Sequence, residues 1–261
     1  MSTYQTHEFP QSRIATIDVC HAGRKKHHVA AMIELDITES RKKVRQTRTM
    51  HEKISFTAWL VKVISLTIEK HQMSASFLKG KRSAMIFDDI NISMVVEKEV
   101  NGQKVPIPMI IEKSQKITAA SITRQINDAK TSPLTEHDIV LQKNTGKMER
   151  LYYHLPGFLR RGIWKFMLKR PRLIYGKMGN VAITSIGMMG NVKGWFIPMS
   201  VHPLCFGIST IQKKPVVVND QIVIREMLSM TILLDHDVID GSDMARFINE
   251  LSKNIEKGTG L

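Results

Sequence analysis

Cysteine is scarce in this chain, and several common sequence signatures are missing from it. Two cysteines, Cys20 and Cys205, occur in 261 residues, which excludes a disulfide framework and a cysteine-rich zinc site. No stretch has the ~18 uninterrupted apolar residues of a membrane-spanning helix, and the N-terminus has no apolar run of signal-peptide length. The patterns GxGxxG and GxxxxGK(S/T) are absent, so neither a dinucleotide site nor a P-loop is expected. We therefore expect a cytoplasmic protein with no bound metal.

Acidic residues are also fewer than basic residues. The chain has 24 acidic and 38 basic residues, which gives a net charge of +14 and a pI near 9.8. Such a charge attracts nucleic acid, an acidic membrane surface or a phosphorylated small molecule. The basic clusters are dispersed, and neither zinc-finger spacing nor an aromatic RNA-binding signature occurs. Nucleic acid is therefore not an expected partner.

The apolar pattern predicts one mixed domain over residues 1–261. Hydrophobic residues make up 43% and charged residues 24%, and no repeat or Gly/Ser-rich linker divides the chain. Strands are predicted at 14–20, 29–38, 180–187, 204–211, 216–224 and 227–236. Helices are predicted at 39–48, 55–71, 117–130 and 242–255, with a further short helix within 131–150. Because strands and helices mix without strict alternation, we expect an α/β fold with a mixed sheet.

Turn residues divide several of these strands. Asn101-Gly102 predicts a β-hairpin over the segment 90–111, because this pair favours a two-residue turn between apolar flanks. Asn219-Asp220 predicts a second turn. Pro215 predicts a break after the strand at 204–211.

The segment 155–173 combines basic and apolar residues at helical spacing. On a helix, one side carries the basic residues Arg161, Lys165, Lys169 and Arg172, and the roughly opposite side carries Leu159, Ile163 and Phe166. One interpretation is a surface helix whose apolar side packs in the core. The other is a helix that contacts a membrane surface or an acyl chain. Pro171 limits the length of this helix.

The stretch "LLDHDVIDGSDMARF" at 233–247 contains the main candidate for chemistry. An apolar run ends at Asp235-His236, and Asp240-Gly241 follows before a helix. Histidine accepts a proton near neutral pH, and a catalytic histidine needs neighbours that fix its ring. Asp240 could hold the loop through a charged partner, and Gly241 could allow a sharp turn into the helix. On spacing alone the motif is a weak signal, and it favours a strand, a turn and a helix start that have no catalytic role.

Several segments together resemble one superfamily. "DHDVIDG" at 235–241 resembles the His-x-x-x-Asp-Gly signature of chloramphenicol acetyltransferases and of the acyltransferase cores of 2-oxo acid dehydrogenase complexes. "SFTAWLVKVISLTIEKHQMSASF", "INISMVVEKEVNGQKVPIPMIIEKSQKIT" and "VAITSIGMMG" are similar to segments of the dehydrogenase cores. "TIDVCHAGRKKHHV" resembles the opening of the chloramphenicol enzymes. The resemblance covers most of the chain and implies a chloramphenicol acetyltransferase-like two-layer sandwich, with a mixed sheet and packed helices.

The resemblance implies a role for each matching residue. His236 matches the base that takes a proton from the thiol of coenzyme A or dihydrolipoamide, or from an acceptor hydroxyl. Asp240 matches an aspartate that pairs with an arginine and fixes the loop, and Arg24 is the matching arginine. Thr184 matches the hydroxyl that donates to the tetrahedral oxyanion, with Ser185 as the alternative donor. Gly241 completes the signature.

The implied function is acyl transfer between coenzyme A, or another thioester, and a thiol, hydroxyl or amine acceptor. The resemblance implies a homotrimer in which histidine and hydroxyl come from different subunits. A carrier protein or a lipoyl-bearing protein is a further expected partner. We expect no lipoyl domain before the core and no lipoyl attachment site in this chain. The acyl donor and acceptor are not specified by the sequence.

Two departures from the family pattern keep other functions open. Dehydrogenase cores usually have "DHR" where this chain has Asp237, and this change keeps a non-catalytic oligomeric scaffold of the same fold as an alternative. The segment 155–173, which precedes the "VAITSIG" strand, is longer than the corresponding segment expected in the family. Peripheral binding to an anionic membrane surface through this segment is the other alternative.

Overall fold

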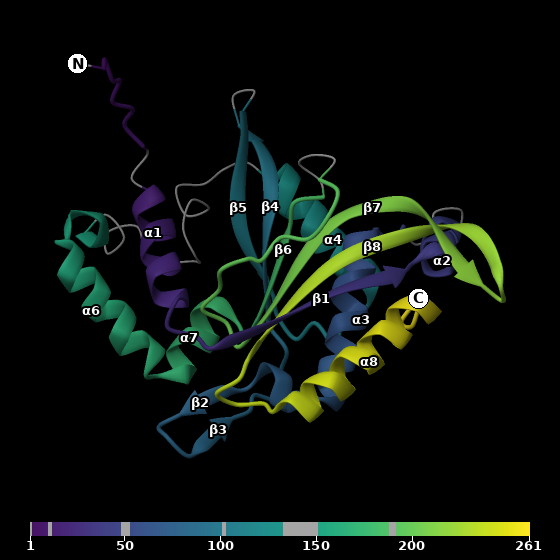
Figure 1. Ribbon diagram of the computed structural model, residues 1–261. Coiled ribbons are helices and arrows are strands. Elements are labelled where there is room, and N and C mark those ends of the chain that lie inside the picture. Colours follow the sequence, from purple (N-terminus) through teal and green to yellow (C-terminus); the bar gives the residue numbers. More distant parts are fainter. Residues whose placement is uncertain (1, 10–11, 48–52, 101–102, 133–150, 188–191) are drawn as a thin grey trace.

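The chain forms a six-stranded mixed sheet with helices packed on one face (Figure 1). The computed structural model describes residues 2–9, 12–47, 53–100, 103–132, 151–187 and 192–261. The sheet order is β1-β8-β7-β6-β4-β5, with β6 parallel to β4 and β7 and the other pairs antiparallel. Its strands are β1 (His28–Asp36), β4 (Ile92–Val100), β5 (Gln103–Ile111), β6 (Val181–Ser185), β7 (Leu204–Val218) and β8 (Gln221–Asp235). A separate hairpin pairs β2 (Phe77–Lys79) with β3 (Ser83–Met85).

The helices form two groups. Those of the first group cover one face of the sheet and are α2 (Thr38–Thr47), α3 (Phe56–Lys70), α4 (Ala119–Thr131) and α8 (Gly241–Lys257). A 3-10 turn, η1 (Gln72–Ala75), follows α3. The second group gathers near the start of β1, as Figure 1 shows, and consists of α1 (Ser12–Gly23), α6 (Gly157–Leu168) and α7 (Pro171–Met178). No helix among the described residues is long and apolar enough to cross a membrane.

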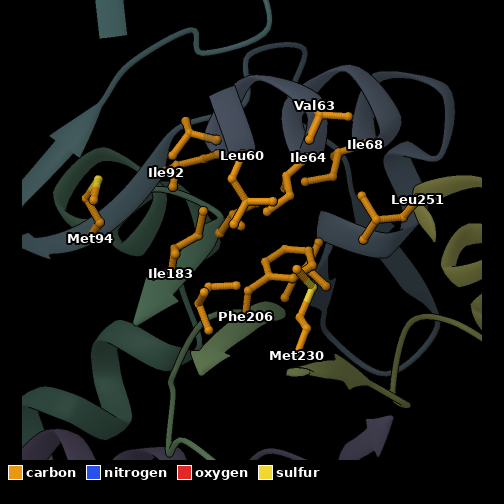
Figure 2. Close-up of a cluster of buried hydrophobic side chains, with 14 of the residues drawn as sticks. Leu60, Val63, Ile64, Ile68, Ile92, Met94, Ile183, Phe206, Met230 and Leu251 are labelled. Carbon is orange, nitrogen blue, oxygen red and sulfur yellow. The ribbon is translucent and has the colours of Figure 1, made fainter. Parts of the chain in front are cut away.

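The main core lies between α3, α8 and the sheet. Figure 2 shows Leu60 and Ile64 of α3 pointing toward Phe206 of β7. The side chains of Ile64 and Phe206 are fully buried. Burying one such side chain stabilises the fold by roughly 1.5–3 kcal/mol. The apolar residues of α3 therefore recur at helical spacing because they face the sheet, as the sequence predicts.

The helix and hairpin predictions are largely confirmed. The four helices predicted at 39–48, 55–71, 117–130 and 242–255 are α2, α3, α4 and α8. Ser55 caps α3, since its hydroxyl accepts a hydrogen bond from the Ala58 N–H at 3.2 Å. Val100 pairs with Gln103 in the hairpin of β4 and β5. The turn residues 101–102, and nearly all of the helix predicted within 131–150, lie outside the described residues.

The break predicted at Pro215 is wrong. Strand β7 continues through Pro215, which pairs with Ile224 of β8. The pairing of β7 with β6 ends at Ile208. Beyond that point β7 has a free edge among the described residues, and a free edge tolerates a residue without an N–H. The predicted turn is confirmed: Asn219 and Asp220 have φ angles of 49° and 60° and join β7 to β8.

The strand predicted at 14–20 is also wrong, because this segment lies within helix α1. Its β-branched residues suggested a strand, but tertiary contacts with α6 override that preference. Val19 and Ala22 pack in a small cluster with Trp164 of α6 and Ile174 of α7. The helix therefore forms because it has a partner that the local sequence does not show.

Candidate functional site

The 235–240 loop, which begins with the last residue of β8 and leads into α8, is tied to the protein by a buried ion pair. The Asp235 side chain is fully buried, and the Nζ of Lys26 lies 2.6 Å from its Oδ2. The other carboxylate oxygen accepts a longer hydrogen bond of 3.4 Å from the N–H of Asp237. A buried carboxylate requires such compensation, since an unpaired buried charge is strongly destabilising. Asp235 therefore fixes the loop from its buried side.

His236 is exposed to solvent, and its main chain holds it in place. The N–H of His236 donates to the carbonyl of His27 at 2.9 Å. The Nδ1 of His27 in turn donates to Asp237 at 2.8 Å. That hydrogen bond to the Asp237 carboxylate raises the pKa of His27. Both neighbours of His236 are therefore anchored by side-chain contacts, and the exposed His236 lies between them.

The pairing expected between Arg24 and Asp240 is not formed in the single chain. Both residues are exposed, and no ion pair joins them among the described side chains. Asp240 is the N-cap of α8, and its carbonyl accepts from the Met244 N–H at 2.9 Å. The prediction placed the stabilising ion pair at Arg24 and Asp240, whereas the structure places one at Lys26 and Asp235. The catalytic-site role of Asp240 and the supporting role of Arg24 stay predictions.

Gly241 does not need the freedom that glycine provides. It is the first residue of α8, it is not among the residues with positive φ, and a Cβ at this position would meet open space. The expected sharp turn is instead made by the loop residues before it. The single chain thus gives no backbone reason for glycine here.

His202 forms a rigid support beneath the loop. It is buried, and its Nε2 donates to the Met178 carbonyl while its Nδ1 accepts from the Ser200 hydroxyl, both at 2.9 Å. The N–H of Asp235 donates to the carbonyl of the next residue, Pro203, at 3.0 Å. Burial lowers the pKa of His202 to about 4. This histidine is therefore neutral and structural, and it helps to place the end of β8.

Thr184 and Ser185 lie on opposite faces of the sheet, because successive strand side chains alternate. Ser185 and Ile183 line a cavity of about 500 Å³ on the helix face, together with Leu60 of α3. Thr184 therefore points to the other face. There it pairs in register with Gly207, where a Cβ would come within 3.1 Å of Pro198 Cδ. Of the two candidate donors, Ser185 faces its own chain and Thr184 faces away from the helix layer.

Thr184 and His236 are far apart within one chain. Thr184, Gly207 and Thr231 form one row across the sheet. His236 lies five residues beyond Thr231 along β8, a distance of roughly 16 Å at ~3.3 Å per residue. One reacting carbonyl cannot lie within hydrogen-bonding distance of both side chains of a single chain.

The segment 155–173 forms α6 and the start of α7, with Pro171 at the start of α7. The interpretation in which Leu159, Ile163 and Phe166 pack in the core is wrong, because these residues are 44%, 38% and 48% exposed. The residue of α6 that is buried is Trp164. Its contacts are with the second helix group rather than the sheet. The apolar stripe of α6 therefore remains open on the single chain.

Sequence reasoning missed Lys26, His27 and Asp235 as residues that support the loop. Lys26 and His27 belong to a basic run that is typical of a solvated surface. The register that pairs His28 with Asp235 brings the run beside the loop. The acid that ends the apolar run was the available signal, since a buried acid needs a cation. Among the described residues, no group of three or more His, Cys, Asp or Glu side chains is placed to hold a metal.

The comparisons with known proteins agree with this architecture. The model of the family described as "2-oxoacid dehydrogenases acyltransferase (catalytic domain)" matches residues 5–142 and 176–261. The dihydrolipoyllysine-residue acetyltransferase component of the pyruvate dehydrogenase complex of Mycoplasma genitalium is 25% identical over 209 residues, which cover 78% of this chain and 44% of that protein. The chain thus spans less than half the length of this curated relative. Helix α6 lies within the residues that the family model leaves unmatched.

Solved structures show the same fold. Azotobacter vinelandii dihydrolipoamide acetyltransferase superimposes with a TM-score of 0.68 and 16% identity over 97% of this chain and 92% of that chain. A chloramphenicol acetyltransferase superimposes with a TM-score of 0.50 and 8% identity, over 95% of this chain and 96% of that one. The expected two-layer fold with a mixed sheet is thereby confirmed.

Proposed function

Because the chain belongs to the family of 2-oxoacid dehydrogenase acyltransferase catalytic domains, we propose that it transfers an acyl group between coenzyme A, or another thioester, and a thiol, hydroxyl or amine acceptor. The Mycoplasma genitalium relative is a dihydrolipoyllysine-residue acetyltransferase, and we propose that this chain also acts on an acyl thioester. A lipoyl-bearing or carrier protein is the proposed macromolecular partner, and the cytoplasm is the proposed location.

Residue spacing supports the assignment of the site. A serine, a histidine and an asparagine were investigated for their role in catalysis by the Azotobacter vinelandii enzyme. In that chain the histidine follows the serine by 52 positions, and the asparagine follows the histidine by 4. Thr184, His236 and Asp240 have the same two separations here. Threonine carries the hydroxyl that serine would provide. We therefore assign His236 as the base, Thr184 as the oxyanion donor and Asp240 as a positioning residue.

The proposed reaction is a direct transfer. His236 removes the proton from the acceptor as the acceptor atom attacks the thioester carbonyl. The Thr184 hydroxyl donates a hydrogen bond to the oxyanion of the tetrahedral intermediate. Collapse of the intermediate breaks the C–S bond, and the departing thiolate takes the proton from the His236 imidazolium. General-base assistance of this kind contributes typically ~10²–10⁴-fold to the rate.

One observation carries the proposal that the site is shared between subunits. His236 lies roughly 16 Å along β8 from the row that contains Thr184, so one chain cannot place both on one substrate. In a cyclic homotrimer, each His236 would face the Thr184 of a neighbour. The exposure of His236 in the single chain fits such a junction.

The test is release of free thiol over a panel of acyl-CoA donors and acceptors. His236→Ala should reduce kcat by about 10²-fold or more. His7→Ala, which removes an exposed histidine far along the chain from the loop, should not. Full turnover by His236→Ala would contradict the mechanism. A trimer that binds no acyl-CoA would instead favour the non-catalytic scaffold.

A second function, peripheral binding to an anionic membrane, is favoured by the exposed stripe of α6. The segment 155–179 contains no acidic residue, and Ile163 and Phe166 are open to solvent. Interfacial helices combine such a basic composition with an exposed apolar side. Ile163→Ser with Phe166→Ser should abolish cosedimentation with phosphatidylglycerol vesicles, and Met73→Ser with Ile86→Ser should not. Equal cosedimentation of both variants with the vesicles would contradict membrane binding through α6.

A further inference from the structure

A second cavity, of about 610 Å³, lies beside the 235–240 loop on the side of the second helix group. It is formed by the end of α1, the β2–β3 hairpin, α6, α7 and the residue after His236. Its apolar lining includes Phe77, Leu168 and Ile174. Its charged lining consists of Lys25, Lys26, Lys81, Lys165, Lys169 and Asp237. A volume of this size suits a small organic ligand.

Four of these lysines have no anionic partner within the described part of the chain. Lys26 is paired with Asp235, and Asp237 is paired with His27. The remaining lysines, at positions 25, 81, 165 and 169, are exposed and make no ion pair there. Like charges around one hollow repel one another, and an anion bound among them would remove that repulsion. The excess of lysines over acidic groups therefore favours an anion as the ligand of this cavity.

Helix α6 is fixed in place over the cavity by a buried polar network. The Asp18 carboxylate of α1 is 5% exposed and accepts from Arg160 Nε at 2.7 Å and from the Tyr152 hydroxyl at 2.6 Å. The Trp164 indole donates to the same hydroxyl at 3.0 Å. Lys165 of α6 and Lys169, which caps the C-terminus of α6, are therefore held by a helix anchored on α1, and the cavity is preformed.

The cavity adjoins the proposed catalytic loop. Asp237 lines it and is the residue after His236. Lys26, which holds Asp235, also lies 6.0 Å from the ring centre of Phe77 on the cavity wall. A ligand in the cavity would thus lie against the residues that position His236.

We propose that this cavity binds a phosphate ester carried on an apolar arm. Lysine ammonium groups act as separate point charges, and several of them can surround one phosphate. The buried apolar wall receives the arm. Lys165 and Lys169 lie in the segment 143–175, which the family model does not match, so this site is an addition to the common core. The ligand's role as a substrate rests on the proposed acyl transfer, whereas its binding does not.

The experiment measures binding of hexyl phosphate to the full chain by calorimetry. Lys165→Gln with Lys169→Gln should weaken binding about tenfold, because the variant removes two of the ammonium groups that line the cavity. The matched control, Arg172→Gln with Lys177→Gln, removes two charges from α7 outside the cavity lining and should change the dissociation constant less than twofold. Hexanol should bind far more weakly than hexyl phosphate. Equal loss in both variants, or equal binding of hexanol, would overturn the proposal.

Coenzyme A and a separate phosphorylated acceptor both carry this chemistry, and competition distinguishes them. If coenzyme A displaces hexyl phosphate, and loses affinity in the α6 double variant, the phosphate belongs to coenzyme A. If both bind together, it belongs to a separate substrate. Each result supports the site. His236→Ala should retain hexyl phosphate binding, so failure of the catalytic mechanism and failure of this site give different results.

Discussion

At the scale of single residues, Asp235 shows how burial determines a side chain's role. Its carboxylate has no exposure, and Lys26, with 14% side-chain exposure, supplies the compensating charge. The sequence places an acid at the end of an apolar strand, which by itself suggests a turn. Because the carboxylate is buried there, it anchors the loop that carries His236.

Lys26→Met should leave Asp235 buried without a cation. We expect the free energy of unfolding to fall by about 3 kcal/mol, because removing one partner of a buried pair is costly. Adding Asp235→Asn should recover part of this loss. Urea unfolding measures both, with Lys25→Met as an exposed control expected to change stability by less than ~0.5 kcal/mol. A loss as large in the control would show that the ion pair is not the cause.

His202 should make the fold sensitive to mild acid. The folded chain keeps this histidine neutral down to a pKa of about 4, whereas the unfolded chain binds a proton near pH 6.5. Between these values the unfolded state binds more protons, so the free energy of unfolding falls as pH falls. At about 1.4 kcal/mol per unit, the loss by pH 4 is on the order of 3 kcal/mol.

Unfolding by urea from pH 7 to pH 4.5 tests this contribution. His202→Gln preserves a donor for the Met178 carbonyl and removes the titrating group. Its stability should therefore vary less with pH than that of the natural chain, and His7→Gln should leave the slope unchanged. Parallel pH profiles for the natural chain and His202→Gln would refute the role of His202.

At the scale of elements, periodic segments with local signals were predictable and segments set by distant partners were not. Helices α3 and α8 show apolar spacing, and the turn at Asn219-Asp220 has its own residue preference. Helix α1 depends on α6, which lies more than a hundred residues away. The ion pair of Lys26 with Asp235 spans 209 positions, and only the register of β1 with β8 brings the two together.

The same reasoning applies to the candidate site. His236 and Thr184 could be selected from family resemblance, because each lies in a motif of local sequence. The placement of Thr184 and Ser185 on opposite faces required the strand register. The cavity beside the loop required the position of α6, which the family pattern does not contain.

The turn between β7 and β8 offers a test at the scale of elements. Both central residues have positive φ, and glycine is the most favourable residue in that region. Asp220→Gly creates an Asn-Gly turn and should raise the free energy of unfolding by roughly 0.5–1 kcal/mol. Thermal unfolding measures the change, with Asp220→Val as the opposite case. A lower melting temperature for Asp220→Gly would contradict the turn assignment.

At the scale of the whole molecule, the far end of the β7–β8 hairpin is apolar and exposed. Val217, Ile222 and Ile224 are 71%, 79% and 73% exposed. Isolated exposed apolar residues are common, but a cluster of this kind is typical of a protein interface. The proposed trimer gives these residues a partner.

Ile222→Lys with Ile224→Lys should therefore weaken the trimer. Sedimentation should show the natural chain at three times 29.7 kDa and the variant shifted toward a single chain. Because the proposed site needs two subunits, turnover should decline together with the trimer fraction. A variant that stays trimeric would show that this hairpin is not part of the interface.

The separation of His236 from Thr184 along the sheet has a genetic consequence. Two inactive chains, His236→Ala and Thr184→Ala, should restore activity to each other when they are produced together. If subunits mix at random in a cyclic trimer, about a quarter of the sites would receive both an intact histidine and an intact hydroxyl. Alleles of this kind would complement in one cell, and a chain with both changes would complement neither.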